Sequence, residues 1–117
     1  MSAVVLSAFQ ESQYFSAATR SRYSALSKDA ALVGALGAGL SDEPAPGVRG
    51  AALDHADPLR HEWDVTVIGT HFAMAFVAQD LGDNSADMHR RFDFAITYDR
   101  ALAVEAASAM MGRLAAR

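Results

Sequence analysis

The sequence has no cysteine, three prolines and one lysine among its ten basic residues. The lack of cysteine excludes a disulfide framework, a cysteine-ligated zinc site and thiol catalysis. The apolar run at residues 72–78 is far shorter than the roughly 20 residues that cross a bilayer. The first residues also lack the basic segment of a signal peptide. We therefore predict a cytoplasmic protein that makes no membrane contact.

Positive charge is also in short supply, with ten basic residues against fourteen acidic ones and a formal net charge of −4. A protein that binds the phosphates of a nucleic acid needs a surplus of Lys and Arg, so we predict no direct nucleic-acid binding. The chain has 117 residues, and 51% of them are hydrophobic. That length and composition predict one globular domain over residues 1–117.

The first forty residues have the pattern of a strand, a helix and a strand. Residues 4–9 form a β-branched and apolar run without helical period, typical of a strand covered on both faces. Residues 12–29 place apolar side chains at three- and four-residue steps, which predicts an amphipathic helix with Ser12 as its N-cap. Residues 31–36 are again apolar. This order favours a parallel strand pair with a right-handed crossover.

The rest of the chain has mostly the two-residue period of strands. Residues 40–60 hold all three prolines and predict a loop with a short edge strand near 48–53. Residues 63–68 and 72–78 alternate as an antiparallel hairpin, and after a polar loop at 82–90 residues 92–98 alternate most clearly. Asp99 then caps a final helix, whose predicted apolar stripe consists of Val104, Ala107, Met111 and Leu114.

These elements predict an α/β (α+β) domain with two main helices and a mixed, mostly antiparallel sheet of five or six strands. Six aromatic residues are expected to anchor its core, since each can bury about 150–250 Å². They are Phe9, Trp63, Phe72, Phe76, Phe92 and Phe94. The domain should fold without a cofactor, and the sequence identifies none.

No motif for catalysis or metal binding is present. The glycines at 34, 37 and 39 end a strand and do not open a helix, so they do not form a phosphate loop. No serine lies in a nucleophile elbow. Neither of two polar groups has the spacing of a zinc or calcium motif, and we predict no metal site. The groups are His55, His61, Glu62, Asp64 and His71, and Asp80, Asp83, Asn84 and Asp87.

Polar and aromatic residues follow the first predicted strand at its carboxyl end. Open α/β sheets commonly bind ligands there, and Gln10, Glu11, Tyr14 and Phe15 are suitable for the wall of a pocket. The alternative is that the polar pair satisfies helix amides while the two aromatic rings pack inward. The sequence leaves both interpretations open.

The order of several short strings resembles the DICT sensory domain, over about residues 4–114. These strings are Ala8-Phe9-Gln10, Tyr14-Phe15, Arg22-Tyr23-x-x-Leu26, Pro58-Leu59-x-x-Glu62-Trp63, Arg91-Phe92 and the helix after Asp99. The family is named for diguanylate cyclases and two-component systems and also accompanies MerR-like regulators. The resemblance implies a non-catalytic signal-input domain. The family usually has a further helical segment before the first strand, which is absent here.

Three functions are compatible with these sequence features. The first is a sensory module that binds a small molecule or a signalling output protein, with ligand-binding residues Gln10, Tyr14, Tyr23, Trp63 and His71. The second is an enzyme built on His71, Asp80 and Arg91. The third is an interaction domain that dimerises through Ala103, Ala106, Ala107 and Met110 of the last helix. We expect a homodimer, because the missing segment should leave part of the sheet or first helix uncovered.

Overall fold

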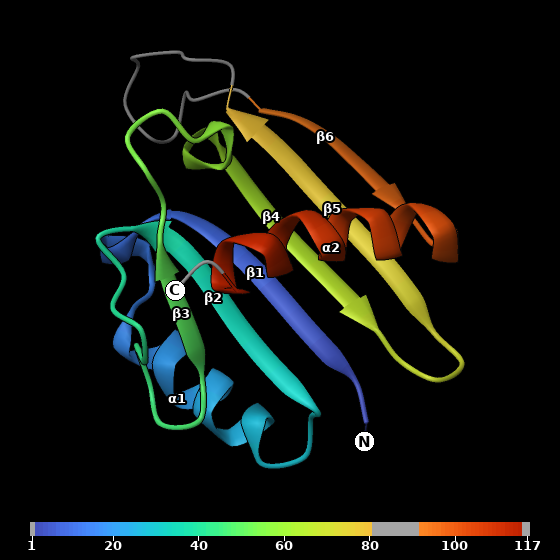
Figure 1. Cartoon of the computed structure of the whole chain (residues 1–117), viewed down its shortest axis with the longest axis horizontal. Helices are drawn as coiled ribbons and strands as arrows, with labels where there is room; N and C mark the ends of the chain where they lie inside the picture. The colour runs from blue at the N-terminus through green and yellow to red at the C-terminus, as the bar shows by residue number, and fades with distance from the viewer. Residues whose placement is uncertain (1, 81–91, 116–117) are drawn as a thin grey trace.

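A computed structural model gives the fold and describes residues 2–80 and 92–115. It contains six strands, two α-helices and two short 3₁₀ helices (Figure 1). In chain order they are β1 Val4–Glu11, η1 Ser12–Tyr14, α1 Ala17–Ser27, β2 Leu32–Ala38, β3 Arg49–Ala52, η2 Pro58–His61, β4 Glu62–Ile68, β5 Ala73–Asp80, β6 Phe92–Thr97 and α2 Arg100–Ala115. The predicted loop at 82–90 lies outside the described residues.

All six strands form one mixed sheet in the order β3-β2-β1-β4-β5-β6. β1 pairs parallel with β2 and antiparallel with β4, so the first strand of the chain lies near the middle of the sheet. β3 is a parallel edge strand, and β4, β5 and β6 form an antiparallel meander. The predicted fold class, with its mixed sheet and two helices, is confirmed.

The first helix begins later than the sequence predicts. Residues 12–14 form the separate 3₁₀ helix η1, and α1 starts after Ser16, whose side chain accepts a hydrogen bond from the Thr19 amide. Ser16, and not Ser12, is therefore the N-cap. The break lets Phe15 turn into the core, where it is among the most buried large side chains.

The two helices lie on opposite faces of the sheet, and Figure 1 shows α2 crossing the strands while α1 lies behind β2 and β3. Val5, Val33 and Val48 belong to the core on the α1 side. The α2 helix covers a second core with four of its side chains, Ala103, Ala107, Met110 and Leu114. The predicted stripe was thus partly wrong, because Val104 and Met111 lie beside the contact line and are exposed.

Among the described residues, the half of the sheet formed by β4, β5 and β6 has a helix on one face only. The α2 helix packs on β4 and β5, whereas α1 packs on β2 (Figure 1). Phe72 and Phe94, which we expected in the core, are exposed as a result. The side chain of Phe92 lies outside the described part of the chain. No helix in that part is long and apolar enough to cross a membrane.

Candidate functional site

A chain of touching aromatic rings lies at the carboxyl end of β1. The Tyr14 ring contacts the Trp63 ring edge-on, with centroids 4.8 Å apart. Trp63 in turn contacts Phe9 at 6.3 Å, and Phe9 contacts Phe15 at 5.1 Å and Tyr23 at 5.7 Å. Edge-to-face contacts of this kind stabilise aromatic clusters beyond the area they bury. The cluster joins β1, η1, α1 and β4 at one corner of the domain.

Gln10 lies beside this cluster in a strained backbone conformation. Its φ of 65° is in the left-handed region, and no other non-glycine residue among those described has a positive φ. The β1–β2 register shifts between Ala8 and Glu11, so the strand bulges at this point. Gln10 is buried, with 4% of the residue exposed. Its Nε2 donates a long hydrogen bond of 3.5 Å to Asp80 at the end of β5. Strain of this kind is often found at functional sites.

Tyr23 has a structural contact as well as a place in the aromatic cluster. Its hydroxyl makes a hydrogen bond of 2.7 Å with the Ser7 hydroxyl, which is buried in the middle of β1. A buried hydroxyl without a partner would destabilise the fold, so this contact satisfies Ser7 and fixes α1 over the sheet. The ring of Tyr23 therefore belongs to the aromatic cluster, while its hydroxyl is hydrogen-bonded to Ser7.

Four of the five predicted ligand-binding residues thus come together, and His71 does not join them. Trp63 pairs with Phe9 near the carboxyl end of β1, whereas Ile68 pairs with Val4 at the other end. His71 follows Ile68 in the β4–β5 turn and is exposed. The same separation applies to the alternative enzyme site, because Asp80 lies at the far end of β5 from His71, and Arg91 lies outside the described residues.

A second polar group lies at the same end of the sheet, on the α2 face. Asp57 caps η2 at the Leu59 amide and receives two hydrogen bonds of 2.8 Å from Arg113 of α2. This bidentate pair lowers the pKa of Asp57, chiefly through the hydrogen bonds from Arg113. It also ties the end of α2 to the segment that leads into β4.

Asp64 of β4 is a buried carboxyl group close to this pair. It is 5% exposed, and its Oδ1 has no hydrogen-bond partner. Burial raises the pKa of Asp64 to about 8, with further contributions from a hydrogen bond with Glu62 and from its charge, while Arg113 acts in the opposite direction. A carboxyl group with this pKa carries a proton at neutral pH.

The buried position of Asp64 could not be predicted from the sequence, where Asp64 stood out only as one of five possible metal ligands. Asp64 and Thr66 alternate with Trp63, Val65 and Val67, and alternation usually indicates that the polar side of a strand meets water. In the structure the polar side is the buried one, under α2. Arg113 could have indicated an acidic residue beneath the helix. An arginine in the last turn of a helix that covers a sheet needs either an acidic partner or contact with solvent.

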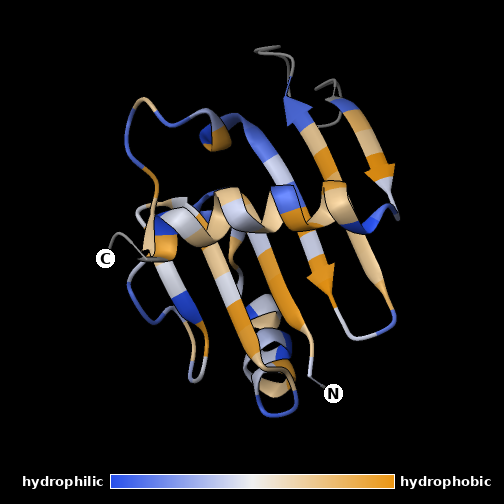
Figure 2. Ribbon diagram, turned by 45° about the vertical axis from the view of Figure 1, so that its right-hand side comes forward, coloured by the Kyte–Doolittle hydropathy of each residue, from blue (hydrophilic) through white to orange (hydrophobic). Residues whose placement is uncertain are grey.

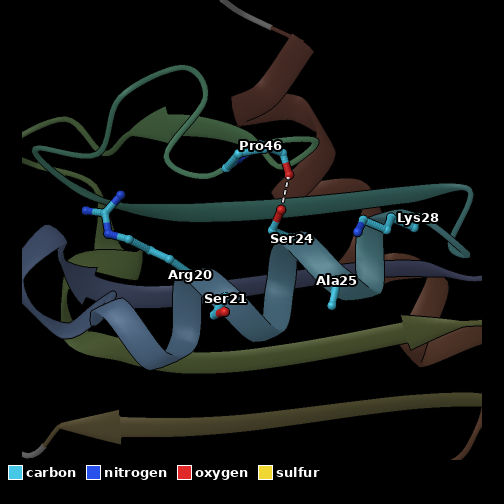
Figure 3. A pocket seen from close by; sticks show the side chains of 6 residues that line it. All are labelled: Arg20, Ser21, Ser24, Ala25, Lys28 and Pro46. Atoms are coloured by element: carbon cyan, nitrogen blue, oxygen red, sulfur yellow. Dashed lines mark hydrogen bonds between the residues drawn. The ribbon is translucent and has the colours of Figure 1, made fainter.

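Two shallow grooves border the helices and contain none of the predicted site residues. One has a volume of about 480 Å³ along α1, and Figure 3 shows Ser24 donating a 2.8 Å hydrogen bond to the Pro46 carbonyl beside it. Its Arg20 donates to the Pro44 carbonyl and lies 5.3 Å over the Phe15 ring. The other, of about 350 Å³, is mainly apolar and lies between α2 and the β1–β4 pair.

Metal-binding clusters of His, Asp and Glu are absent from residues 2–80 and 92–115. The predicted dimer contacts Ala103, Ala107 and Met110 pack against the sheet and are buried. The Ala/Met face of α2 therefore covers the core.

Comparison with known proteins identifies the family. No curated protein and no solved structure matches the chain. The family model described as the sensory domain in diguanylate cyclases and two-component systems matches residues 1–81, which include β1 to β5 and the aromatic corner. β6 and α2 lie beyond the match. With more than half of its length matched, the chain belongs to the DICT family of sensory domains.

Proposed function

We propose that this domain is a non-catalytic, cytoplasmic signal-input module that binds a small molecule at the aromatic corner formed by Gln10, Tyr14, Tyr23 and Trp63. The strained, buried Gln10 beside half-buried aromatic rings is the observation that carries the proposal. A left-handed glutamine costs about 1–3 kcal/mol, and such a cost is typically retained where a side chain must be presented in one direction. Membership of a sensory family supports the same role.

The corner favours a planar ligand with hydrogen-bonding edges. Tyr14 and Trp63 offer ring faces and edges for stacking, and the Gln10 amide and Asp80 carboxylate offer donors and acceptors at the same end of the sheet. The site lies beyond the carboxyl ends of the parallel pair β1 and β2, where ligands commonly bind in open α/β sheets. A change at Gln10 would reach the end of β5 through Asp80.

The experiment begins with the chain purified from its own cells under native conditions. Native mass spectrometry and the absorbance spectrum would detect a retained small molecule or chromophore. Once a compound is identified, titration should show that Gln10→Ala and Trp63→Leu each weaken its binding about tenfold or more, the scale of one lost hydrogen bond or stacking contact.

The matched control is His71→Ala, at the opposite end of β4, which should bind the compound as the parent does. Far-ultraviolet circular dichroism would establish that all variants are folded. If Gln10→Ala and Trp63→Leu bind as tightly as the parent, the ligand site lies elsewhere. If His71→Ala alone weakens binding, the hairpin turn is the site instead.

Protein contact is a second candidate function. The specific observation that favours it is the exposed apolar face of β5 and β6, where Phe94 and Ile96 face solvent. A signal-input domain must pass its state to another polypeptide, and a face of this kind offers the contact.

A further inference from the structure

Most of the large apolar residues of β4, β5 and β6 lie on the face of the sheet that α2 does not cover. Val65 and Val67 of β4 pair with Phe76 and Met74 of β5, and Phe76 pairs with Ile96 of β6. Paired residues share a face in an antiparallel sheet. Together with Phe94, these side chains form what we call the open face: Val65, Val67, Met74, Phe76, Phe94 and Ile96. At its border with β1, Val67 also packs against the core on the α1 side.

The distribution of side-chain size indicates that a further layer of protein packs on the open face. On β5 the residues under α2 include Ala73 and Ala75, while the open face receives Met74 and Phe76. On β4 the buried side holds Asp64 and Thr66, and the open side holds valines. Figure 2 shows several hydrophobic residues along β5 and β6. Strands that are apolar on both faces normally have a layer on each.

The exposure of the open face is large for a protein of this size. Phe94 is 72% exposed and Ile96 is 50% exposed, and the Phe94 ring lies 6.2 Å from that of Phe76. At roughly 150–250 Å² for a large apolar side chain, the face and the adjoining Phe72 and Tyr98 rings offer roughly 700 Å². That is close to the about 800 Å² that each partner contributes to a stable interface, and above the usual patch on a monomer.

The charge distribution favours a second copy of this chain as the occupant. The six residues of the open face are uncharged, and Asp80, which follows on the same side of β5, lies at the strand end and accepts a hydrogen bond from Gln10. The open face can therefore meet itself across a two-fold axis without like-charge repulsion at its centre. A lipid surface is disfavoured because the net charge is −4 and membrane-binding faces are usually bordered by basic residues. The face is also a regular sheet surface, and two such surfaces pack well about 10 Å apart.

We propose that two copies of the domain pack their open faces together across a two-fold axis, with Phe94 and Ile96 at the centre of the contact. The dimer is a sandwich of two β4–β5–β6 sheets, each covered on its outer side by its own α2. This proposal goes beyond the ligand-binding function and has a readout of its own. The two sites adjoin, because Trp63 of the ligand corner lies on the same face of β4 as Val65. The centre of the dimer contact is on β6, whereas Gln10 and Tyr14 belong to β1 and η1.

The test is sedimentation equilibrium and light scattering of the full chain over a range of micromolar concentrations. The parent should have twice the monomer mass of 12.4 kDa. The double variant Phe94→Ser/Ile96→Ser should dissociate, with a dimer Kd raised by about 100-fold or more, because each change acts twice across the axis. Both residues are exposed in the single chain, so the variant should remain folded by circular dichroism.

Leu102→Ser is the matched control, since Leu102 is an exposed apolar residue on α2, away from the open face. It should leave the dimer intact. A parent that stays at 12.4 kDa throughout the range would overturn the proposal. So would a double variant that dimerises as the parent does, or a monomeric parent that sediments with lipid vesicles. The compound-binding test stays separate through Gln10→Ala, because Gln10 lies in β1, outside the open face.

Discussion

At the scale of single residues, Asp64 has the most unusual environment on the α2 face. Its carboxyl group faces Glu62 on its own strand and Arg113 on α2, and burial outweighs the attraction of the arginine. The pKa of Asp64 is therefore about 8 in the folded domain, against 3.8 in the unfolded chain. Since a raised pKa means that the folded state holds its proton more tightly, Asp64 stabilises the fold at low pH and loses this contribution as pH rises.

Asp64→Asn should remove most of the pH dependence of stability between about pH 5 and 8. For the parent, the free energy of unfolding should fall with rising pH in this window by up to about 1.4 kcal/mol per unit. An asparagine resembles the protonated acid in shape and does not ionise, so the variant should be the more stable protein at pH 8. Urea unfolding at several pH values measures both. A parent whose stability is constant from pH 5 to 8 would contradict the prediction.

At the scale of elements, two glycines show how differently one added methyl group should act. Gly112 lies in α2 with no atom within 4 Å of the position a Cβ would occupy. Gly50 lies in β3, where a Cβ would collide with the Ser41 carbonyl oxygen and the Pro44 ring. The edge strand can lie this close to the preceding loop only because residue 50 has no side chain.

Gly112→Ala should raise the free energy of unfolding by about 0.5–1 kcal/mol, because alanine restricts the unfolded chain and is the better helix former. Gly50→Ala should lower it by about 1–3 kcal/mol, the cost of overpacking. Urea midpoints at equal slope measure both changes. Equal stability of Gly50→Ala and the parent would show that the loop can move away from β3, contrary to the tight packing described.

Much of this element structure could be predicted from the sequence, because apolar runs, alternation and the 3.6-residue repeat are local patterns. They located the described strands and both helices, although the N-cap of the first helix is Ser16 and not Ser12. They could not decide which face of β4 is covered, since alternation distinguishes two faces without identifying the one that faces the core. The one-residue shift from Val104 and Met111 to Ala103 and Met110 has the same origin. At the candidate site, Gln10 and Tyr14 could be placed together through the end of the first strand. Trp63 and His71 both depended on a strand register that no local pattern contains, and the structure brings only Trp63 to the corner.

At the scale of the whole molecule, α2 joins the two halves of the sheet. It packs against strands from β3 at one edge to β5 near the other, and Arg113 fixes its end to Asp57 (Figure 1). The parallel and antiparallel halves therefore share one helix and one core. An element shared in this way makes independent unfolding of either half unfavourable.

We predict that the domain unfolds in one cooperative step. Differential scanning calorimetry should give a single peak whose calorimetric enthalpy equals the van't Hoff enthalpy, analysed with monomer or dimer stoichiometry as appropriate. Near-ultraviolet signals from Trp63 should change together with the far-ultraviolet signal. Two resolved peaks would mean that β4–β6 and the parallel half are separate folding units, and the prediction of one domain over residues 1–117 would then be wrong.

The central position of β1 has a consequence for how the chain folds. The parallel partner β2 follows after one helix, but the antiparallel partner β4 arrives only after β3 and η2, so that Phe9 pairs with Trp63 across more than half of the described sequence. Closing a loop of that length costs conformational entropy, and this cost arises before the contact between β1 and β4 stabilises the chain. Folding speed falls as contacting residues become more distant in sequence. The docking of β4 onto β1 should therefore limit the rate of folding, and until it occurs the first strand exposes an unpaired edge on which misfolding and aggregation can begin.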